Sequence, residues 1–478
     1  MSLNYGNSTV STKISIPVIN WAAYNNRANT DSALVAEPAV GQCLFARYFS
    51  AVKVPAPSLL IVPARFKDSK LYSQIPTNGS GDFTVVRADN TATRVNSSGN
   101  IEIVNANIPR LDYFVGGTAG CPALLVEPSG SNSVLRSQDF SATWAATVSA
   151  TVTGVTSPDG TANASIFIAD STSNRVRQSV SLVSGTTYTY SLFGKFDALS
   201  SGFTMNVFEE NTTAYGSGVC QAFNLNEGTL GASGSVGAGF TLQSAGMENY
   251  GNGWYRCRMT VLMGYTTPSG ATGGRVGFRI GTQIQSGRPL SVVSGSVSAW
   301  GAQIETGSVA TSYIPTTTAA VTRNADVVSV SRAVSGAIGQ TEGTMYCEFE
   351  ATNDAATRRI FTLSDGSSAN RIMIYYSASA WRAQIQATSI SLGNFTSGYH
   401  KIAFAYQQNG VSGNLFASID GGAVVSGTSA TFPTSLSMVT LGKIEGTTSS
   451  SFLNARIRAA ALYTTRLTND QLAALTTP

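Results

Sequence analysis

Two carboxylates stand close together in the last third of the sequence, where they could act as an acid and a base. Glu348 and Glu350 lie two residues apart within residues 343–350, which we predict to be a β-strand. Side chains two apart on a strand face the same side, whereas glycoside hydrolysis needs carboxyl groups on both sides of the scissile bond. We therefore expect Glu348 and Glu350 to be solvated residues at a strand edge.

The sequence contains one histidine, His400. A Ser-His-Asp triad cannot be assembled without it, and its neighbours at intervals of two, Ile402 and Phe404, would share its face of a strand. We expect a structural histidine at a sheet edge. No catalytic residue is predicted, so the sequence favours a protein that is not an enzyme.

Aromatic side chains offer a different chemistry, because a flat exposed ring can stack against a sugar. Trp381, Tyr375 and Tyr376 lie on two successive predicted strands, and we take them as the candidate glycan-binding residues. The alternative is that tryptophans fill the cores between sheets, as large aromatics commonly do. We expect this of Trp254 and Trp300.

Metal binding has little support in the sequence. Four acidic residues could bind Ca²⁺ together with loop carbonyls: Asp354, Asp365, Asp420 and Glu445. No loop, however, carries oxygen ligands at a fixed spacing. We predict neither a metal nor another cofactor.

Five cysteines lie far apart and form no CxxC pair: Cys43, Cys121, Cys220, Cys257 and Cys347. With a single histidine beside them, they make no zinc-binding pattern. We expect buried free thiols, with a bridge between Cys220 and Cys257 as the alternative.

The composition indicates an all-β protein with several domains. A chain of 478 residues is long enough for two to four domains. Charged residues make up 12%, about half the usual ~25%, which leaves few Glu, Lys and Arg for the solvent faces of long helices. Glycine, serine, threonine and valine suit strands and turns instead.

Charge and hydropathy exclude two classes of partner. The net charge of +4 comes from scattered residues without a basic run, so we expect no nucleic-acid partner. No apolar run approaches the ~20 residues that a membrane helix needs, so we expect no membrane insertion. The N-terminus lacks the basic and apolar regions of a signal peptide.

The first 80 residues differ from the rest in their prolines and short apolar segments. Residues 58–62 are predicted to form a short buried strand between Pro57 and Pro63. We predict that residues 1–80 form a small, mainly β anchoring domain that docks on other proteins.

Residues 81–130 are predicted to form a connecting β motif. Residues 101–104 and 124–126 have the composition of strands. Arg110 and Asp112 are expected to form a local ion pair that holds a turn. Residues 87–96, 108–113 and 122–128 resemble a segment that precedes a sandwich module in many phage tail proteins.

Residues 131–330 are predicted to form one β-sandwich, with a hairpin turn at Asn252-Gly253. Three segments in order, 132–140, 251–256 and 300–305, resemble a β-sandwich module that recurs in phage tail and virion-surface proteins. The resemblance implies a jelly roll of the carbohydrate-binding type.

Residues 331–478 are predicted to form a second β-sandwich. It contains the strand with His400, an Asp420-Gly421 hairpin and a capping box from Thr468 to Gln471 that predicts a short final helix. This order resembles the laminin-G-like, concanavalin-like lectin sandwich. Glycosidases on that fold carry an E-x-D-x-x-E pattern that residues 348–353 do not match.

The expected fold is therefore all-β, with two consecutive antiparallel sandwiches after the anchoring domain. The resemblance implies a non-enzymatic structural protein of a tailed-phage virion, a tail fibre or surface appendage that binds host-surface glycans. A capsid decoration or head-fibre protein is the alternative, and a depolymerase tailspike is a lesser one.

The same resemblance implies partners and a location. Residues 1–80 would contact other virion proteins, and the chain would form a homo-oligomer, with a trimer favoured. It would be made in the host cytoplasm and end on the virion surface.

Overall fold

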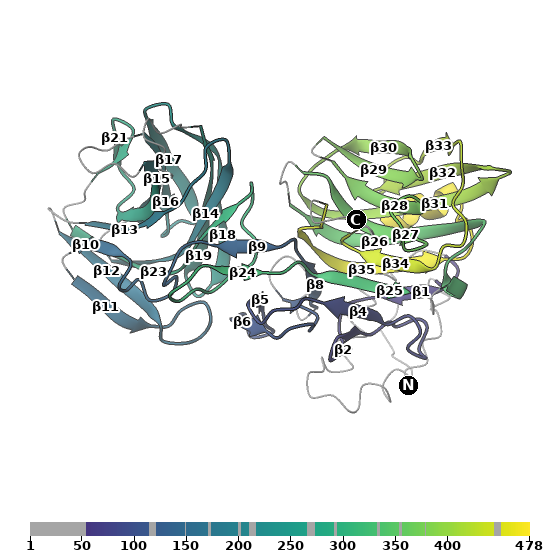
Figure 1. The fold of residues 1–478 in the computed structure, drawn as a ribbon, viewed down its shortest axis with the longest axis horizontal. Coiled ribbons are helices and arrows are strands. Elements are labelled where there is room, and N and C mark those ends of the chain that lie inside the picture. Colours follow the sequence, from purple (N-terminus) through teal and green to yellow (C-terminus); the bar gives the residue numbers. More distant parts are fainter. Residues whose placement is uncertain are drawn as a thin grey trace, which may run out of the picture.

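The computed structural model describes residues 54–478, apart from 114–120, 149, 171–173, 199–201, 210–216, 265–272, 291–293, 332–334, 353–355, 378 and 444–450. The described part of the chain is almost entirely antiparallel β-structure, with one short α-helix, α3 (Asn469–Thr476). The predicted all-β class is confirmed. Two sandwiches lie side by side (Figure 1). No helix among the described residues is long and apolar enough to cross a membrane.

The first sandwich has two six-stranded sheets. One has the order β10 (Ala145–Val148), β13 (Asn174–Val180), β20 (Gly274–Ile280), β15 (Gly202–Glu209), β16 (Gly218–Asn224) and β17 (Thr229–Val236). The other has the order β11 (Ala150–Val155), β12 (Ala164–Asp170), β23 (Ser294–Thr306), β14 (Thr187–Ala198), β19 (Trp254–Met263) and β18 (Phe240–Gly251). Trp254 and Trp300 are buried as predicted, but they lie with Tyr313 in a separate cluster and not in the core between the two sheets, so their predicted place between the sheets is wrong.

The second sandwich has a larger pair of sheets. One has the order β33 (Val425–Ser429), β32 (Ser412–Ile419), β31 (Gly398–Asn409), β26 (Glu342–Ala351), β35 (Ala455–Tyr463), β8 (Ala123–Val126) and β7 (Leu111–Asp112). The other has the order β2 (Phe66–Lys67), β3 (Lys70–Leu71), β4 (Phe83–Val86), β25 (Val327–Ser331), β34 (Met438–Leu441), β27 (Arg358–Ser364), β28 (Arg371–Tyr376), β29 (Ala380–Ile385) and β30 (Thr388–Asn394).

Strands from the N-terminal region belong to the second sandwich (Figure 1). β1 (Leu59–Ile61) pairs with β35, and it is buried on both faces. Leu59 and Ile61 lie in the main core, whereas Leu60 lies in a smaller cluster that includes two leucines of α3. The predicted buried strand is thus confirmed, but the described part of residues 1–80 extends existing sheets rather than forming a sheet of its own. Residues 1–53 lie outside the described residues, and an anchoring role stays a prediction.

Two local predictions are confirmed at the ends of elements. Asn252 and Gly253 both have positive φ, 52° and 79°, in the turn between β18 and β19, as a tight hairpin turn requires. At the start of α3, the Thr468 side chain accepts from the Gln471 backbone, and the Gln471 side chain accepts from the Thr468 backbone. This capping box supplies partners for two N–H groups that the helix itself cannot bond.

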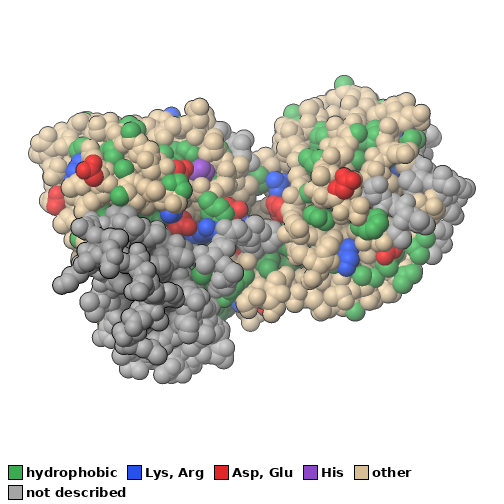
Figure 2. Space-filling view, turned by 180° about the vertical axis from the view of Figure 1, so that it is seen from behind, with side chains coloured by type: hydrophobic (Ala, Val, Ile, Leu, Met, Phe, Trp, Pro, Cys, Tyr) green, Lys and Arg blue, Asp and Glu red, His purple; other side chains and the backbone are tan. Residues whose placement is uncertain are grey.

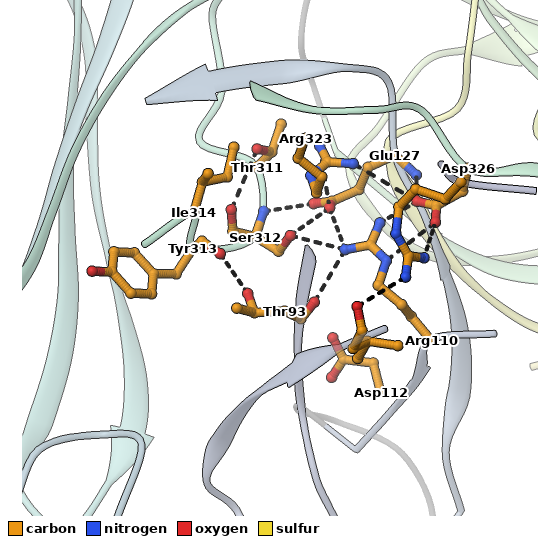
Figure 3. A network of polar contacts seen from close by, with 12 residues as sticks. Thr93, Arg110, Asp112, Glu127, Thr311, Ser312, Tyr313, Ile314, Arg323 and Asp326 are labelled. Atoms are coloured by element: carbon orange, nitrogen blue, oxygen red, sulfur yellow. Dashed lines mark hydrogen bonds and ion pairs between the residues drawn. The ribbon is translucent and has the colours of Figure 1, made fainter. Parts of the chain in front are cut away.

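A buried network of charges lies where the sandwiches meet. Arg110 sits between Glu127 and Asp326 (Figure 3); its Nη1 donates to Glu127 at 2.7 Å, and its Nη2 donates to Asp326. Asp326 also accepts from Arg87 at 2.9 Å, and Arg323 lies 3.5 Å from Glu127. Glu127 in turn accepts the Ser312 N–H at 2.7 Å. We call these five charged residues the junction network: Arg87, Arg110, Glu127, Arg323 and Asp326.

The predicted ion pair between Arg110 and Asp112 is wrong. Asp112 lies in β7, which neighbours β8, and β8 pairs with β35. This places Asp112 3.5 Å from Arg456 of β35, while Arg110 enters the junction network. Strand pairing in the sheet, rather than proximity in the sequence, determines the ion-pair partners of Arg110 and Asp112.

The cysteines differ from the prediction in one respect. Cys220, Cys257 and Cys347 are buried free thiols, so Cys220 and Cys257 do not form a bridge. Cys121, by contrast, is disulfide-bonded. Cys43 lies outside the described residues.

The outer surface reflects the composition. Charged side chains are sparse on the face that Figure 2 shows, where most of the described surface is uncharged. Where arginines do gather on a sheet face, they therefore stand out from their surroundings.

Candidate functional site

Two of the three predicted glycan-binding aromatics are core residues. Trp381 and Tyr376 are 2% and 1% exposed. Their rings lie 5.4 Å apart, and Trp381 also packs against Phe349 and His400. A ring enclosed in this way has no face for a sugar, so the prediction for Trp381 and Tyr376 is wrong. Alternation explains it, because both residues fall on the inward side of their strands.

Tyr375 faces the opposite way, onto the outer surface of the second sandwich. Its neighbours Ile374 and Tyr376 belong to the core, so the alternation of a strand turns Tyr375 outward. Strand pairing sets it opposite Arg359 of β27 on one side and Arg382 of β29 on the other. A row of arginine, tyrosine and arginine therefore crosses three strands.

Arg359 covers the Tyr375 ring. Its guanidinium carbon lies 4.9 Å from the ring centroid, within the range of a cation–π contact. Arg371, four residues before Tyr375 on β28, shares the outward face. Met373 lies between them and is 1% exposed, so long side chains cover this part of the sheet. We call Arg359, Arg371, Tyr375 and Arg382 the Tyr375 face.

The guanidinium groups of this face have unused hydrogen-bond donors. Arg359 Nε and Nη1 and Arg371 Nε are buried and have no hydrogen-bond partner. Burial lowers the pKa of both arginines; the Tyr375 hydroxyl opposes that shift, and for Arg359 the charge of Arg371 adds to it. Among the described residues, no carboxylate forms an ion pair with Arg359, Arg371 or Arg382.

Such a face suits an anion chemically. A guanidinium offers donors in a planar fork that matches carboxylate, phosphate and sulfate groups. The Nε and Nη1 of Arg359 and the Nε of Arg371 are enclosed by the protein, so an anion would meet the outer nitrogens of these guanidinium groups, where each hydrogen bond to a charged group contributes about 1.5–3 kcal/mol. Arg382 Nη1 has one weak partner, Ser389 Oγ at 3.4 Å. Stacking of a sugar on Tyr375 is not available on the ring face that Arg359 covers.

The carboxylates that could have done acid–base chemistry are engaged in ion pairs. Glu348 lies 3.5 Å from Arg458, and Glu350 lies 3.6 Å from Arg456. Both are on β26, which lies between β31 and β35. The predicted location at a strand edge is therefore wrong, because this strand is internal to its sheet.

His400 has a structural environment, although not at a sheet edge. Its Nδ1 lies 2.6 Å from Asp420 Oδ2, and its Nε2 lies 3.0 Å from the Thr396 carbonyl oxygen. β31, which carries it, pairs with β26 and β32. Both ring nitrogens are thus held by neighbours within the chain.

The described acidic residues that were considered for Ca²⁺ have other contacts. Asp420 accepts from the Lys401 backbone as well as facing His400, and Asp365 bonds Ser367 and Asn370. In the part of the chain that the structure describes, no group of three or more His, Cys, Asp or Glu side chains could hold a metal ion. Asp354 and Glu445 lie outside that part.

Sequence reasoning missed the arginines of the Tyr375 face, although a signal was present. On β28, Arg371 and Tyr375 alternate with the apolar residues Ile372 and Ile374. Selecting by alternation rather than by aromatic type would have separated Tyr375 from Tyr376. It would also have grouped Tyr375 with Arg371.

Comparison with known proteins gave likenesses of fold only. No family model and no curated protein matches the chain. The CBM40 module of the Ruminococcus gnavus IT-sialidase, solved with α2,3-sialyllactose, is 15% identical; the match covers 30% of this chain and 88% of that one, with a TM-score of 0.26. The NanB sialidase of Streptococcus pneumoniae is 16% identical over 30% of this chain and 26% of that one, with a TM-score of 0.26.

A pentraxin is also similar in fold. The heptameric SAP-like pentraxin of Limulus polyphemus is 13% identical, over 28% of this chain and 69% of that one, with a TM-score of 0.24. All these likenesses cover less than a third of the chain, and what those proteins bind is not transferred from them to this one.

Proposed function

We propose that this chain is a non-enzymatic display protein on the surface of a tailed-phage particle, and that it binds acidic glycans of the host surface through the Tyr375 face. The observation that carries the binding proposal is the pair of arginines, Arg359 and Arg371, which lie on the outward face of the sheet around Tyr375 without a carboxylate partner among the described residues. The phage location rests on the sequence resemblance in residues 131–330.

Charge supports acidic rather than neutral glycans. Hydrogen bonds to charged groups contribute about 1.5–3 kcal/mol each, whereas a neutral sugar would depend on stacking against a ring that Arg359 already covers. One such site gives weak binding on its own, because ~4 kcal/mol corresponds to a Kd of ~1 mM. A trimer would present three copies and strengthen binding through effective concentration.

A glycan array probed with the full chain tests the proposal. Wild type should bind glycans with carboxylate, phosphate or sulfate groups, and the double variant Arg359→Gln/Arg371→Gln should lose at least about tenfold in affinity, or ~1.4 kcal/mol. Arg466→Gln is the matched control, because Arg466 also stacks on a ring of the second sandwich, that of Phe416, but on β32 of the other sheet.

Three results would count against the proposal. Equal binding by wild type and the double variant would remove the Tyr375 face as the site. No binding of any glycan at ~1 mM would favour the alternative of a decoration protein whose sandwiches are only structural. Loss of polymer viscosity on mixing would instead indicate a depolymerase.

A further inference from the structure

A second group of arginines lies on the outer face of the first sandwich. On β13, Arg175 and Arg177 alternate with Val176, which is a core residue. On β20, Arg275 and Arg279 alternate with Val276 and Phe278, also core residues. Strand pairing sets Arg175 directly opposite Arg279. The four guanidinium groups therefore extend from one side of the same two adjacent strands.

A short hairpin packs over β16 and β17 on the same side of the sheet and borders an open cavity beside the arginines. The hairpin is β21 (Ile284–Gln285) and β22 (Arg288–Pro289). It approaches the sheet closely: Cys220 Sγ lies 3.4 Å from the Gly287 carbonyl oxygen. A side chain at Gly234 of β17 would collide with the hairpin, since its Cβ would lie 2.8 Å from Gly287 O. The hairpin also brings a fifth arginine, Arg288, toward the other four.

The cavity has a volume of about 430 Å³, within the range of sites that bind small molecules. Five of its lining residues are arginines and one is a glutamate, Glu209. The whole chain has 30 lysines and arginines, so a sixth of its basic residues line one cavity. Apolar side chains, Phe208 and Leu290 among them, and the amides of Asn206 and Gln285 complete the lining.

We propose that this cavity is a second glycan-binding site, which takes a sugar that carries a carboxylate, phosphate or sulfate group. The arginines bind the anionic group, the two amides bond hydroxyls, and the apolar residues contact ring carbons. The inference extends the proposed function to acidic glycans, but it does not depend on the Tyr375 face, because the two sites are on different sandwiches.

The arginines need not be without other contacts for this role. Arg175, for example, donates to Thr147 Oγ1 at 3.1 Å. A guanidinium has five N–H donors, so a partner within the protein leaves others for a ligand. An internal partner also holds the fork in one orientation, which lowers the entropy lost on binding.

The concave shape favours a sugar over a nucleic acid. Proteins that bind single strands follow the backbone along a basic groove with stacking aromatics. Here the charge is confined to a cavity beside a hairpin. Phe208, the aromatic lining residue on the outward side of β15, is only 7% exposed.

Calorimetry with the full chain tests the inference. The probes are a galacturonate tetrasaccharide and mannose 6-phosphate, with a neutral galactose tetrasaccharide and mannose as their uncharged counterparts. At least one acidic probe should bind more tightly than its counterpart. That binding should fall about tenfold in Arg275→Gln/Arg279→Gln, should weaken with added salt, and should persist in Arg359→Gln/Arg371→Gln.

A variant outside the two six-stranded sheets guards against a folding artefact. Arg288→Gln changes only the hairpin, and it should weaken binding while leaving the melting temperature unchanged. Unaltered binding in both cavity variants would overturn the inference. So would equal affinity for the neutral sugars, failure of both acidic probes, or tighter binding of a single-stranded oligonucleotide.

The same variants separate the two proposals. If binding is lost in Arg359→Gln/Arg371→Gln alone, the Tyr375 face stands and the cavity fails. If it is lost in the cavity variants alone, the probe occupies the cavity, and the Tyr375 face stands or fails separately by the glycan array with its own double variant.

Discussion

The junction network and the Tyr375 face use the same side chain in opposite ways. At the junction, Arg110 is fully buried, and each of its three guanidinium nitrogens donates to a carboxylate. On the outer face, Arg359 and Arg371 have buried N–H groups without a partner. Both places therefore bury parts of guanidinium groups, but only at the junction are these groups paired with carboxylates. A guanidinium paired with carboxylates fixes the structure, whereas one on an outer face without a carboxylate leaves its accessible N–H groups for a ligand.

Replacement of Arg110 should have the largest effect. Arg110→Met removes the cation between Glu127 and Asp326, and breaking a buried ion pair from one side costs about 3–5 kcal/mol. We expect the free energy of unfolding to fall by that amount in urea titrations at pH 7. A loss under ~1 kcal/mol would mean that Arg87 and Arg323 neutralise both carboxylates without Arg110.

The second-largest effect is expected from acid, which should weaken the junction network. Burial alone would raise the pKa of Glu127, but Arg323 and Arg110, with a hydrogen bond from Ser312, hold it well below its usual range. Its folded pKa is thus lower than its unfolded value of ~4.3. The stability from Glu127 is present above that value and is lost as the pH falls below it.

Urea titrations from pH 7 to pH 3 measure this dependence. Wild type should lose stability below about pH 4.3, where unfolded glutamate takes up protons. Glu127→Gln should be less stable at pH 7 and should show a shallower decline, because residue 127 no longer titrates. Parallel curves for the two proteins would show that other carboxylates cause the acid sensitivity.

Local sequence signals predicted local structure well. The Asn252-Gly253 turn and the Thr468–Gln471 capping box involve residues at most three apart, and both are present. The buried strand near residue 60 was found from its apolar run. The apolar run did not show that this strand belongs to the second sandwich, because its pairing partner, Leu462 for Leu59, lies far along the chain. No local pattern specifies a partner that far along the chain.

At the candidate site, too, the sequence predicted features within one strand but not contacts between distant strands. Proximity in the sequence pairs Arg110 with Asp112, but the partners of Arg110 in the structure are 17 and 216 residues away. Trp381 and Tyr375 were grouped by aromatic type, and strand alternation divides them between core and surface. The arginines around Tyr375 come from three strands, so their gathering depends on sheet order. Sequence alone gives each strand's faces but not which strands are neighbours.

On the outer face, replacing an arginine is expected to raise the free energy of unfolding, whereas replacing Arg110 lowers it. Arg371→Met is the same substitution as at Arg110, but here it removes a buried N–H without a partner and a charge that burial disfavours. Removing one unsatisfied buried donor is worth about 1–3 kcal/mol, offset in part by weaker solvation of methionine. We expect the free energy of unfolding to rise by about 1 kcal/mol in urea at pH 7. A fall of ~2 kcal/mol would show that Arg371 has a structural role.

An exposed pair separates the effect of pairing from the effect of burial, and it should show the smallest change. Arg136 Nη1 lies 3.4 Å from Asp139 Oδ2, with side chains 32% and 53% exposed. Water screens such pairs, which contribute about 0–1 kcal/mol. Asp139→Asn, which can keep the hydrogen bond that its side chain accepts from the Ser141 N–H, should change the free energy of unfolding by under ~0.5 kcal/mol. A loss as large as that of Arg110→Met would mean that pairing alone stabilises this protein, and that burial does not set the difference between its arginines.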